Sequence, residues 1–552
     1  MIDIRSRSRS SYLLLTGSTG LLGEYLIRDL LQRGVLLAVV ARPSPIASAA
    51  QRIDAICHRW QRVRGQALPR PVVLEGHLDK PGWGLSADQH RWIETNCDAL
   101  LHNAASLQFV AESREGEPWL TNMHGTERML ELCERWKIAE LHHISTAYVC
   151  GRRTGIIRET ELDQGQQFGN DYEASKCASE LMVRSASDRF KSVTVHRPAI
   201  ITGDYHTGYT STFHGLYAPL KIAASLLYQT PLMEVSESTL VKTLDLSGSE
   251  EKNFVSVDWV SEVISSIVCD RSLHNQTYHL TAEYRTNCQT LANVMHETFA
   301  EHAMEILVKE IEKAAASPGR QNKNSSLPTL SLEGLQSAFR EQMEIYQAYW
   351  RSDPVFDRSN LNAALPYLAP PPIDADSIRR LCRFALKSNF GWPKPPITTP
   401  KFLAGDLLQD HGFAKPAANK SNRITTIETD SVADLNLRVL GDGGGDYAVQ
   451  FGSRGDDDAW VNVGFDIRQG ARCTLSAATL RRLVDGELSL GAAVSRGAVV
   501  IGNKCAFKAV SAGKSNDNSP RVCKTDFVKE MMERWINVLS SQTANPISSI
   551  PR

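Results

Sequence analysis

The sequence lacks any long uncharged hydrophobic run. No apolar stretch among its 552 residues approaches the ~20 residues that a helix needs to span a bilayer. The longest candidate, around residues 217–235, is interrupted by Lys221, Gln229 and Pro231. The basic N-terminal segment IRSRSRSS has no apolar core, so we expect a disordered tail there and not a secretory signal. We therefore predict no transmembrane segment, while peripheral contact with a membrane stays open.

An excess of charge of either sign is also missing. The chain has 61 Lys and Arg against 62 Asp and Glu, for a net charge of −1. This balance gives no reason to expect nucleic acid as a partner, nor strong attraction to an anionic membrane. The chain length predicts two or three domains, and the composition, 42% hydrophobic, is that of a globular protein.

Paired cysteines are absent as well. The 11 cysteines are scattered, odd in number and without a C-x-x-C pair. This pattern disfavours a disulfide framework and favours reduced thiols in a cytoplasm. We predict no metal site, because no histidine has a partner at metal-ligand spacing. The histidines nearest the predicted strand ends are therefore expected to be structural: His102, His142, His143 and His214.

What the sequence does contain is a strand–turn–helix–strand unit over residues 11–42. The apolar run Leu13–Leu15 is typical of a buried parallel strand. Gly17, Gly20 and Gly23 follow, and an apolar helical face begins immediately after them. Glycines between a strand and a helix let the backbone approach a pyrophosphate, which also faces the positive end of the helix dipole. The unit predicts nucleotide binding, although three glycines can also form an ordinary loop.

The end of the second predicted strand favours NADPH. A site for NAD usually offers an acidic residue there, whereas an arginine accommodates the 2′-phosphate of NADP. This chain has Arg42 and no nearby Asp or Glu, and Arg52 could add a second positive contact. The alternative is that Arg42 is a solvated surface residue.

Strands and helices continue to alternate up to about residue 203, which predicts a doubly wound parallel sheet of the α/β class. Ligands of such sheets lie beyond the C-terminal ends of the strands. Residues 205–395 are less regular and mostly helical, and we interpret them as a smaller substrate lobe. Predicted strands cover 71–78, 98–106, 141–151 and 193–203, and predicted helices cover 85–96, 119–136, 290–315, 332–350 and 375–389, with a further helix beginning near Tyr172.

The residue composition and the predicted secondary structure change twice beyond the lobe. We predict a nucleotide-binding region with its substrate lobe over residues 1–392, a linker over 393–428 that is rich in Pro, Lys, Thr and Asn, and a C-terminal domain over 429–552. The C-terminal domain reads as an antiparallel α+β unit with a closing amphipathic helix, TDFVKEMMERWINVL.

Tyr172 and Lys176 form a Tyr-x-x-x-Lys pair at a predicted helix start. The spacing places both side chains on one helical face, where an ammonium would lower the pKa of the phenol. Such a pair can exchange a proton with a carbonyl oxygen while a nicotinamide transfers hydride. Thr146, at the preceding strand end, could orient the substrate oxygen, with Ser145 as a mere strand cap. Asn122 could support the lysine or be satisfied locally.

These motifs resemble the extended short-chain dehydrogenase/reductases. The matching segments are TGSTGLLG, HNAA, ISTAYVCG, YEASK, HRPAIITGD and NFVSVDWV. The resemblance implies a catalytic trio of Thr146, Tyr172 and Lys176. It also implies that the cofactor contacts Tyr172 and Lys176 together with Gly17, Ser18, Thr19, Gly20, Leu22, Gly23, Arg42, Asn103, Ala104, Ala105, Pro198 and Ile201.

Within that group, residues 10–392 look most like thioester reductase and fatty acyl-CoA reductase domains. The segments GHLDKPGWGLS, NAASLQF and STAYV carry this likeness. One departure is His77, which stands where the family commonly has an Asp near the adenine. The C-terminal segment CTLSAATLRRLVDGELSLGAAVSRGAVVIGN is similar to sterol-carrier-protein domains, which enclose an apolar tunnel. A domain that only supports folding or dimerisation is the alternative.

The sequence therefore predicts an NADPH-dependent reductase of a lipid-like carbonyl, most simply an acyl thioester of coenzyme A or of a carrier protein. Two alternatives stay open. One is a sterol dehydrogenase or nucleotide-sugar epimerase on the same fold. The other is a lipid carrier that senses NADP(H) without turnover. The sequence does not specify the acyl chain, the aldehyde or alcohol product, or the oligomeric state.

Overall fold

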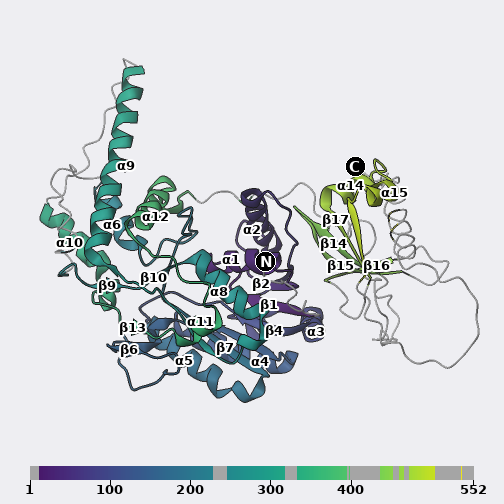
Figure 1. Ribbon diagram of the computed structural model, residues 1–552, viewed down its shortest axis with the longest axis horizontal. Coiled ribbons are helices and arrows are strands. Elements are labelled where there is room, and N and C mark those ends of the chain that lie inside the picture. Colours follow the sequence, from purple (N-terminus) through teal and green to yellow (C-terminus); the bar gives the residue numbers. More distant parts are fainter. Residues whose placement is uncertain are drawn as a thin grey trace, which may run out of the picture.

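The computed structural model describes residues 11–227, 241, 245–316, 332–393, 397, 435–451, 459–464, 471–503, 532 and 536. Figure 1 shows the larger sheet and its helices at the centre, with α9 and α10 on one side and a second, smaller sheet on the other. Within the described part of the chain, no helix is both long and apolar enough to cross a membrane.

The chain begins with the predicted strand–turn–helix–strand unit. Strand β1 (Tyr12–Thr16) is buried throughout and leads through the glycine turn into helix α1 (Leu21–Gln32). Strand β2 (Leu37–Ala41) follows and pairs in parallel with β1. A parallel pair requires a crossover connection, and α1 provides it.

Seven parallel strands form the central sheet in the order β11-β7-β5-β4-β1-β2-β3. The predicted doubly wound parallel sheet is thus confirmed, but the seventh strand, β11 (Thr277–Leu280), was not predicted. The other six strands of the sheet correspond to the predicted strands. Besides β1 and β2, they are β3 (Val72–Glu75), β4 (Cys97–His102), β5 (Glu140–Ile144) and β7 (Ser192–Pro198).

Two predicted strands are shorter than expected. The predicted strand 193–203 divides after Pro198, and its second part, β8 (Ile200–Thr202), pairs in parallel with β10 (Phe254–Ser256) outside the main sheet. The predicted strand 141–151 stops at Ile144, and residues Ala147–Cys150 form a 3₁₀ turn, η3. Both strands end earlier than predicted at the carboxyl edge of the sheet. Thr146 and Ile201 therefore lie at that edge, just beyond the strands of the main sheet.

The two faces of the sheet carry separate hydrophobic cores, as the alternation of strand side chains requires. Leu13 and Leu15 pack with α1, α2 and α8, whereas Tyr12 and Leu14 pack with α3, α4 and α5. The helices are α2 (Ala49–Arg64), α3 (Ala87–Asn96), α4 (Gly125–Trp136), α5 (Asp171–Ser185) and α8 (Val257–Cys269).

A helical lobe follows the sheet. Its core joins α6 (Tyr217–Leu227), α9 (Cys288–Ala316) and α12 (Ala375–Lys387), and α10 (Leu332–Met343) packs against α6. The 3₁₀ segment η7 (Glu344–Tyr349) continues α10. The short strand β9 (Glu251–Lys252) pairs with β12 (Thr286–Asn287), and β13 (Val355–Phe356) pairs with β6 (Ile156–Ile157). The segment between α9 and α10, SPGRQNKNSS onward, lies outside the described residues.

A second core belongs to the C-terminal region. Five strands pair in the order β16-β15-β14-β17-β18, with α14 (Ala477–Val484) and α15 (Leu490–Ser495) packed on them. The prediction of an antiparallel sheet was wrong in one respect: β14 and β17 run parallel. The strands are β14 (Leu435–Leu440), β15 (Gly445–Phe451), β16 (Ala459–Val463), β17 (Ala471–Ser476) and β18 (Val499–Asn503). Most of the predicted linker and of the closing helix lie outside the described residues.

Candidate active site

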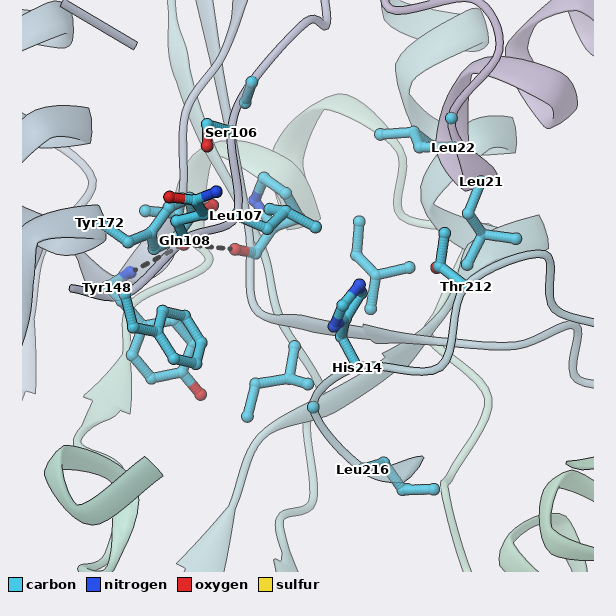
Figure 2. A pocket seen from close by; sticks show the side chains of 18 of the residues that line it. Leu21, Leu22, Ser106, Leu107, Gln108, Tyr148, Tyr172, Thr212, His214 and Leu216 are labelled. Atoms are coloured by element: carbon cyan, nitrogen blue, oxygen red, sulfur yellow. Dashed lines mark hydrogen bonds between the residues drawn. The ribbon is translucent and has the colours of Figure 1, made fainter. Parts of the chain in front are cut away.

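One cavity of about 1200 Å³ opens at the carboxyl ends of the central strands. Its volume exceeds the range of about 300–1,000 Å³ that is usual for a single ligand. The glycine turn forms one end, the predicted catalytic side chains lie along its middle, and apolar side chains of the lobe form the other end. Figure 2 shows Tyr148 and Tyr172 on one side of this space, Leu21, Leu22 and Thr212 on the other, and His214 between them.

The glycine turn is closed so tightly that only glycine fits at two positions. Gly17 has φ +67°, and a Cβ there would lie 2.7 Å from the backbone nitrogen of Ala104. A Cβ on Gly23 would lie 2.1 Å from the carbonyl oxygen of Gly17. The Asn103 amide holds the turn by donating to that same Gly17 oxygen at 3.0 Å.

The turn has the features of a phosphate cradle. No side chain caps the N-terminus of α1, so its first N–H groups face the cavity uncapped. The Ser18 hydroxyl is buried and has no hydrogen-bond partner among the described residues. A buried donor without a partner is costly, and a phosphate oxygen would satisfy it. These residues therefore fit the diphosphate of a dinucleotide.

Two arginines line the cavity beyond the end of β2. The Arg52 guanidinium donates to the Arg42 carbonyl oxygen at 2.6 Å, and burial together with the charge of Arg42 lowers the pKa of Arg52. Two adjacent cations disfavour each other's charge unless an anion lies between them. His77 does not line the cavity, whereas Leu78 and Asp79 do, so Asp79 is the acidic residue that sequence reasoning missed at this end.

Thr146, Tyr172 and Lys176 converge at the middle of the cavity. The Thr146 hydroxyl donates to the Pro198 carbonyl oxygen at 3.4 Å and accepts from the Tyr148 backbone N–H at 3.3 Å, the latter contact being drawn in Figure 2. The Lys176 ammonium, 2% exposed, donates to the Ile144 carbonyl oxygen at 2.7 Å. The structure therefore brings the predicted trio together.

The pKa values of Tyr172 and Lys176 differ from the sequence-based expectation. Burial raises the pKa of Tyr172 to about 12, an effect that the Thr146 hydrogen bond opposes. Burial also lowers the pKa of Lys176 to about 8. We expected the ammonium to lower the pKa of the phenol. In this state the ammonium faces the Ile144 carbonyl, and desolvation of the phenol dominates.

Ser145 and Asn122 have structural partners. The Ser145 hydroxyl donates to Glu180 at 2.6 Å, and Glu180 is held by the fully buried Arg197 at 2.7 Å. The Asn122 side chain accepts from the Ser106 N–H at 2.8 Å and donates to the Ser175 hydroxyl at 3.0 Å. Asn122 thus fixes the residue next to Lys176 and does not bind the lysine itself.

The remaining predicted site residues also lie at this cavity. The cavity is lined by Gly17, Ser18, Thr19, Gly20, Leu22, Arg42, Asn103, Ala104, Ala105, Pro198 and Ile201. Gly23 does not line it but packs closely against the backbone of the glycine turn. His102 bonds Thr16 at 2.9 Å, and His214 lines the cavity. Among the described residues, no group of three or more His, Cys, Asp or Glu is arranged to hold a metal ion.

Sequence reasoning missed the lobe side of the cavity. We call the apolar gallery the set of lobe residues that form this end: Leu216, Pro219, Val241, Leu246, Phe254, Leu291, Ala292, Met295, Phe339, Met343, Ile345 and Trp350. It also missed Tyr148 and Lys252, which lie between the trio and the gallery. The apolar periodicity of α9 and α10 signalled helices there, but helical periodicity alone does not reveal which face meets a ligand.

A parallel doubly wound sheet, a glycine turn before α1 and a Thr-Tyr-Lys trio at the carboxyl edge are together typical of nucleotide-dependent oxidoreductases of the short-chain dehydrogenase/reductase class. Residues 15–264, just under half of the chain, match the NAD-binding family described as "Male sterility protein". The chain therefore contains an NAD(P)-dependent reductase domain of the extended short-chain dehydrogenase/reductase type.

Curated relatives are larger proteins. The L-2-aminoadipate reductase large subunit of Penicillium chrysogenum is 27% identical over 225 residues, which are 38% of this chain and 16% of that protein. The isonitrile lipopeptide synthase of Streptomyces coeruleorubidus is 27% identical over 224 residues, which are 39% of this chain and 15% of that protein. This chain thus spans a small part of the length of the curated relatives it matches.

Among solved structures, the terminal R domain from the myxalamid PKS-NRPS biosynthetic pathway is similar, with a TM-score of 0.51 and 23% identity. The similarity covers 70% of this chain and 92% of that domain. It shows that the two share a fold.

Proposed function

We propose that this protein is an NADPH-dependent reductase that converts an acyl thioester, carried by coenzyme A or by a carrier protein, into an aldehyde. The observation that carries this proposal is the single cavity that joins the nucleotide turn to the apolar gallery past Thr146 and Tyr172. A dinucleotide at one end and an acyl chain at the other would meet at the trio. The names of the matched relatives, an aminoadipate reductase and a lipopeptide synthase, agree with an acyl substrate.

The raised pKa of Tyr172 suits the direction of reduction. A phenol that stays protonated at neutral pH can donate its proton to a carbonyl oxygen that becomes negative. NADPH, when bound, supplies the hydride for the thioester carbon. The Thr146 hydroxyl hydrogen-bonds the same oxygen, and the Lys176 ammonium stabilises the tyrosinate that forms. The hydroxyl proton then returns to Tyr172 as the C–S bond breaks, which releases the thiol as thiolate and leaves an aldehyde.

Arg42 and Arg52 support the choice of NADPH over NADH. Both guanidinium groups line the cavity past β2, where the adenosine ribose lies in folds of this class. A 2′-phosphate between them would relieve their mutual repulsion and would bind through charge-assisted hydrogen bonds.

We also propose that the region beyond residue 429 is a separate domain of the sterol-carrier type, which holds or delivers the apolar chain. The independent core of its five-stranded sheet supports a separate domain, and the sequence likeness supports the type. Residues 1–392 would then form the reductase and its lobe, joined to that domain by the linker 393–428.

The test is NADPH oxidation, followed at the nicotinamide absorbance, with a panel of acyl-coenzyme A thioesters and the matching free aldehydes. We expect consumption with the thioesters and a loss of about 10²–10⁴-fold in kcat for Tyr172→Phe, because the proton donor is removed. The matched control is Tyr284→Phe, since Tyr284 is exposed and far from the trio in sequence and lines no part of the cavity.

Three outcomes would contradict the proposal. Consumption with aldehydes alone would remove the thioester from it. Full thioester activity in Tyr172→Phe would refute the mechanism. Bound NADPH without any consumption, combined with NADP⁺ reduction by sterols or nucleotide sugars, would favour the alternative chemistry of the same fold.

A further inference from the structure

We propose that Lys252 determines substrate specificity by donating a hydrogen bond to a neutral oxygen on the acyl chain, such as a hydroxyl, keto or amide oxygen. This inference rests on the proposed function, because it concerns the acyl end of the same cavity. It predicts that the natural substrate is an oxygen-bearing acyl group and not a plain saturated chain.

Lys252 is a buried cation on the cavity wall. It lies in β9, is 6% exposed and lines the cavity next to Phe254. Its ammonium lies 5.6 Å from the centre of the Tyr349 ring. Burial raises the pKa of the Cys288 thiol at the start of α9, and the positive charge of Lys252 partly opposes this rise. Lys252 therefore lines the part of the cavity that the lobe forms.

Asp353 holds the ammonium in place. It forms an ion pair with Lys252 through Oδ1, while its Oδ2 accepts from the Tyr148 hydroxyl and from the Asn253 backbone N–H, both at 2.7 Å. Both carboxylate oxygens are thus occupied by donors. Tyr148 lies two residues after Thr146, in the 3₁₀ turn η3. The Asp353 carboxylate therefore connects this turn to Lys252.

The ammonium keeps one donor for a ligand. Of its three N–H groups, one pairs with Asp353 and one donates to the Arg351 carbonyl oxygen at 3.2 Å. The third has no partner among the described residues. A buried donor without an acceptor is unfavourable, so a ligand oxygen in the cavity would be bound there.

The surroundings define the chemistry of that ligand. Lys252 is the one charged side chain on the lobe side of the cavity, where its described neighbours are the residues of the apolar gallery with Cys288, Tyr346 and Tyr349. Asp353 already neutralises the lysine, so a substrate carboxylate would bring an uncompensated negative charge into an apolar wall. A neutral oxygen is therefore the better match.

The experiment compares acyl thioesters of one chain length that carry either no oxygen or a single keto group at successive carbons. For the wild-type protein with NADPH, we expect kcat/KM for the best keto isomer to exceed that of the plain chain by about tenfold, mainly through KM. Lys252→Met should abolish this preference, so that kcat/KM for the keto isomers falls to that for the plain chain in the same variant. The matched free aldehydes should show the same preference, because the oxygen lies on the acyl side.

Two further variants separate recognition from folding. Lys252→Met leaves Asp353 buried without its cation, so the double variant Lys252→Met/Asp353→Asn restores neutrality and should also lack the preference. Lys191→Met, the same change at an exposed lysine that lines no part of the cavity, should keep it.

Calorimetric titration with unreactive acyl alcohols, with and without the keto group, keeps this inference testable if turnover is not observed. Equal affinities for the two ligands in the wild-type protein would overturn the role of Lys252, whatever the fate of the proposed reaction. A preference that survives both variants would overturn it as well. A preference seen with thioesters and absent with the matched aldehydes would show that the keto group is not recognised through the acyl chain alone and would contradict the acyl assignment.

Discussion

The protonation states of Tyr172 and Lys176 are set by their burial more than by each other. Both pKa values move in the direction that favours the neutral side chain, to about 12 for the phenol and to about 8 for the ammonium. This arrangement stores a proton on the tyrosine, as reduction of a carbonyl requires. It also makes the charge of Lys176 costly to the folded protein.

Lys176→Met should therefore stabilise the cofactor-free protein while it removes activity. The pKa of Lys176 falls from 10.5 to about 8 on folding, so the unfolded chain binds more protons between these values and stability rises with pH over that window. At neutral pH the charge costs roughly 3 kcal/mol, part of which the Ile144 hydrogen bond offsets. Thermal unfolding from pH 7 to 10 measures this, with Lys191→Met as control. A lower melting temperature for Lys176→Met throughout this range would contradict it.

Arg42→Ala should raise KM for NADPH by about tenfold or more and leave KM for NADH nearly unchanged. The reason is that Arg42 would contact a phosphate that only NADPH carries, and hydrogen bonds between charged groups are the strong ones. Steady-state kinetics with both nucleotides measure the effect. Arg64→Ala, an exposed arginine at the far end of α2, is the control. Equal losses with both nucleotides would mean that Arg42 does not read the 2′-phosphate.

At the scale of elements, the turn between β1 and α1 fixes the position of the nucleotide. Its glycines are not equivalent, because a Cβ on Gly23 would lie 2.1 Å from the Gly17 carbonyl oxygen, whereas a Cβ on Gly20 would lie 3.5 Å from that oxygen, an ordinary van der Waals distance. The spacing of the glycines in the sequence does not distinguish these two roles.

Gly23→Ala should lower the free energy of unfolding by about 1–3 kcal/mol or more and abolish NADPH binding, because the added methyl group would displace the turn backbone. Gly20→Ala should fold with nearly wild-type stability, since Gly20 has a negative φ and an added Cβ would make only an ordinary van der Waals contact. Chemical denaturation and NADPH titration compare the two variants. Similar stabilities would show that the turn adjusts to the extra atom.

At the scale of the whole molecule, the turn between β14 and β15 connects the C-terminal sheet to the nucleotide-binding region. Asp442, between β14 and β15, bonds His58 at 2.7 Å and Gln61 at 2.8 Å on α2, and Arg70 at 3.1 Å. Arg70 is itself buried against Asp54 at 2.6 Å, and Asp54 accepts from the Gly443 N–H. The same helix α2 carries Arg52 into the cavity at its other end, so the contact connects the two regions through a rigid element.

Asp442→Ala should uncouple the unfolding of the two regions. Three hydrogen bonds across the contact are lost, so we expect the C-terminal sheet to unfold in a separate, earlier calorimetric transition and to become more sensitive to protease. The exposed Asp485, which pairs only locally with Arg481, provides the control Asp485→Ala. One unchanged transition for Asp442→Ala would show that other contacts hold the regions together.

The sequence by itself determined what depends on neighbours along the chain. The alternation of apolar runs and amphipathic helices predicted the parallel sheet, and the glycine turn was visible because a strand, a turn and a helix follow within about twenty residues. Tyr172 and Lys176 were recognisable as a pair because four residues make one helical turn. The side of the cavity nearest these motifs was therefore predicted, down to Arg42 and Thr146.

Only the tertiary structure decided what depends on distant segments. β11 joins the sheet beside β7, and β14 pairs with β17, through contacts that no local pattern encodes. Asp353 meets Tyr148 and Lys252 across 205 and 101 residues, and burial reverses the expected shift in the pKa of Tyr172. Sequence periodicity shows which face of an element is buried, but the partner of that face and the degree of desolvation are set when the whole chain packs together.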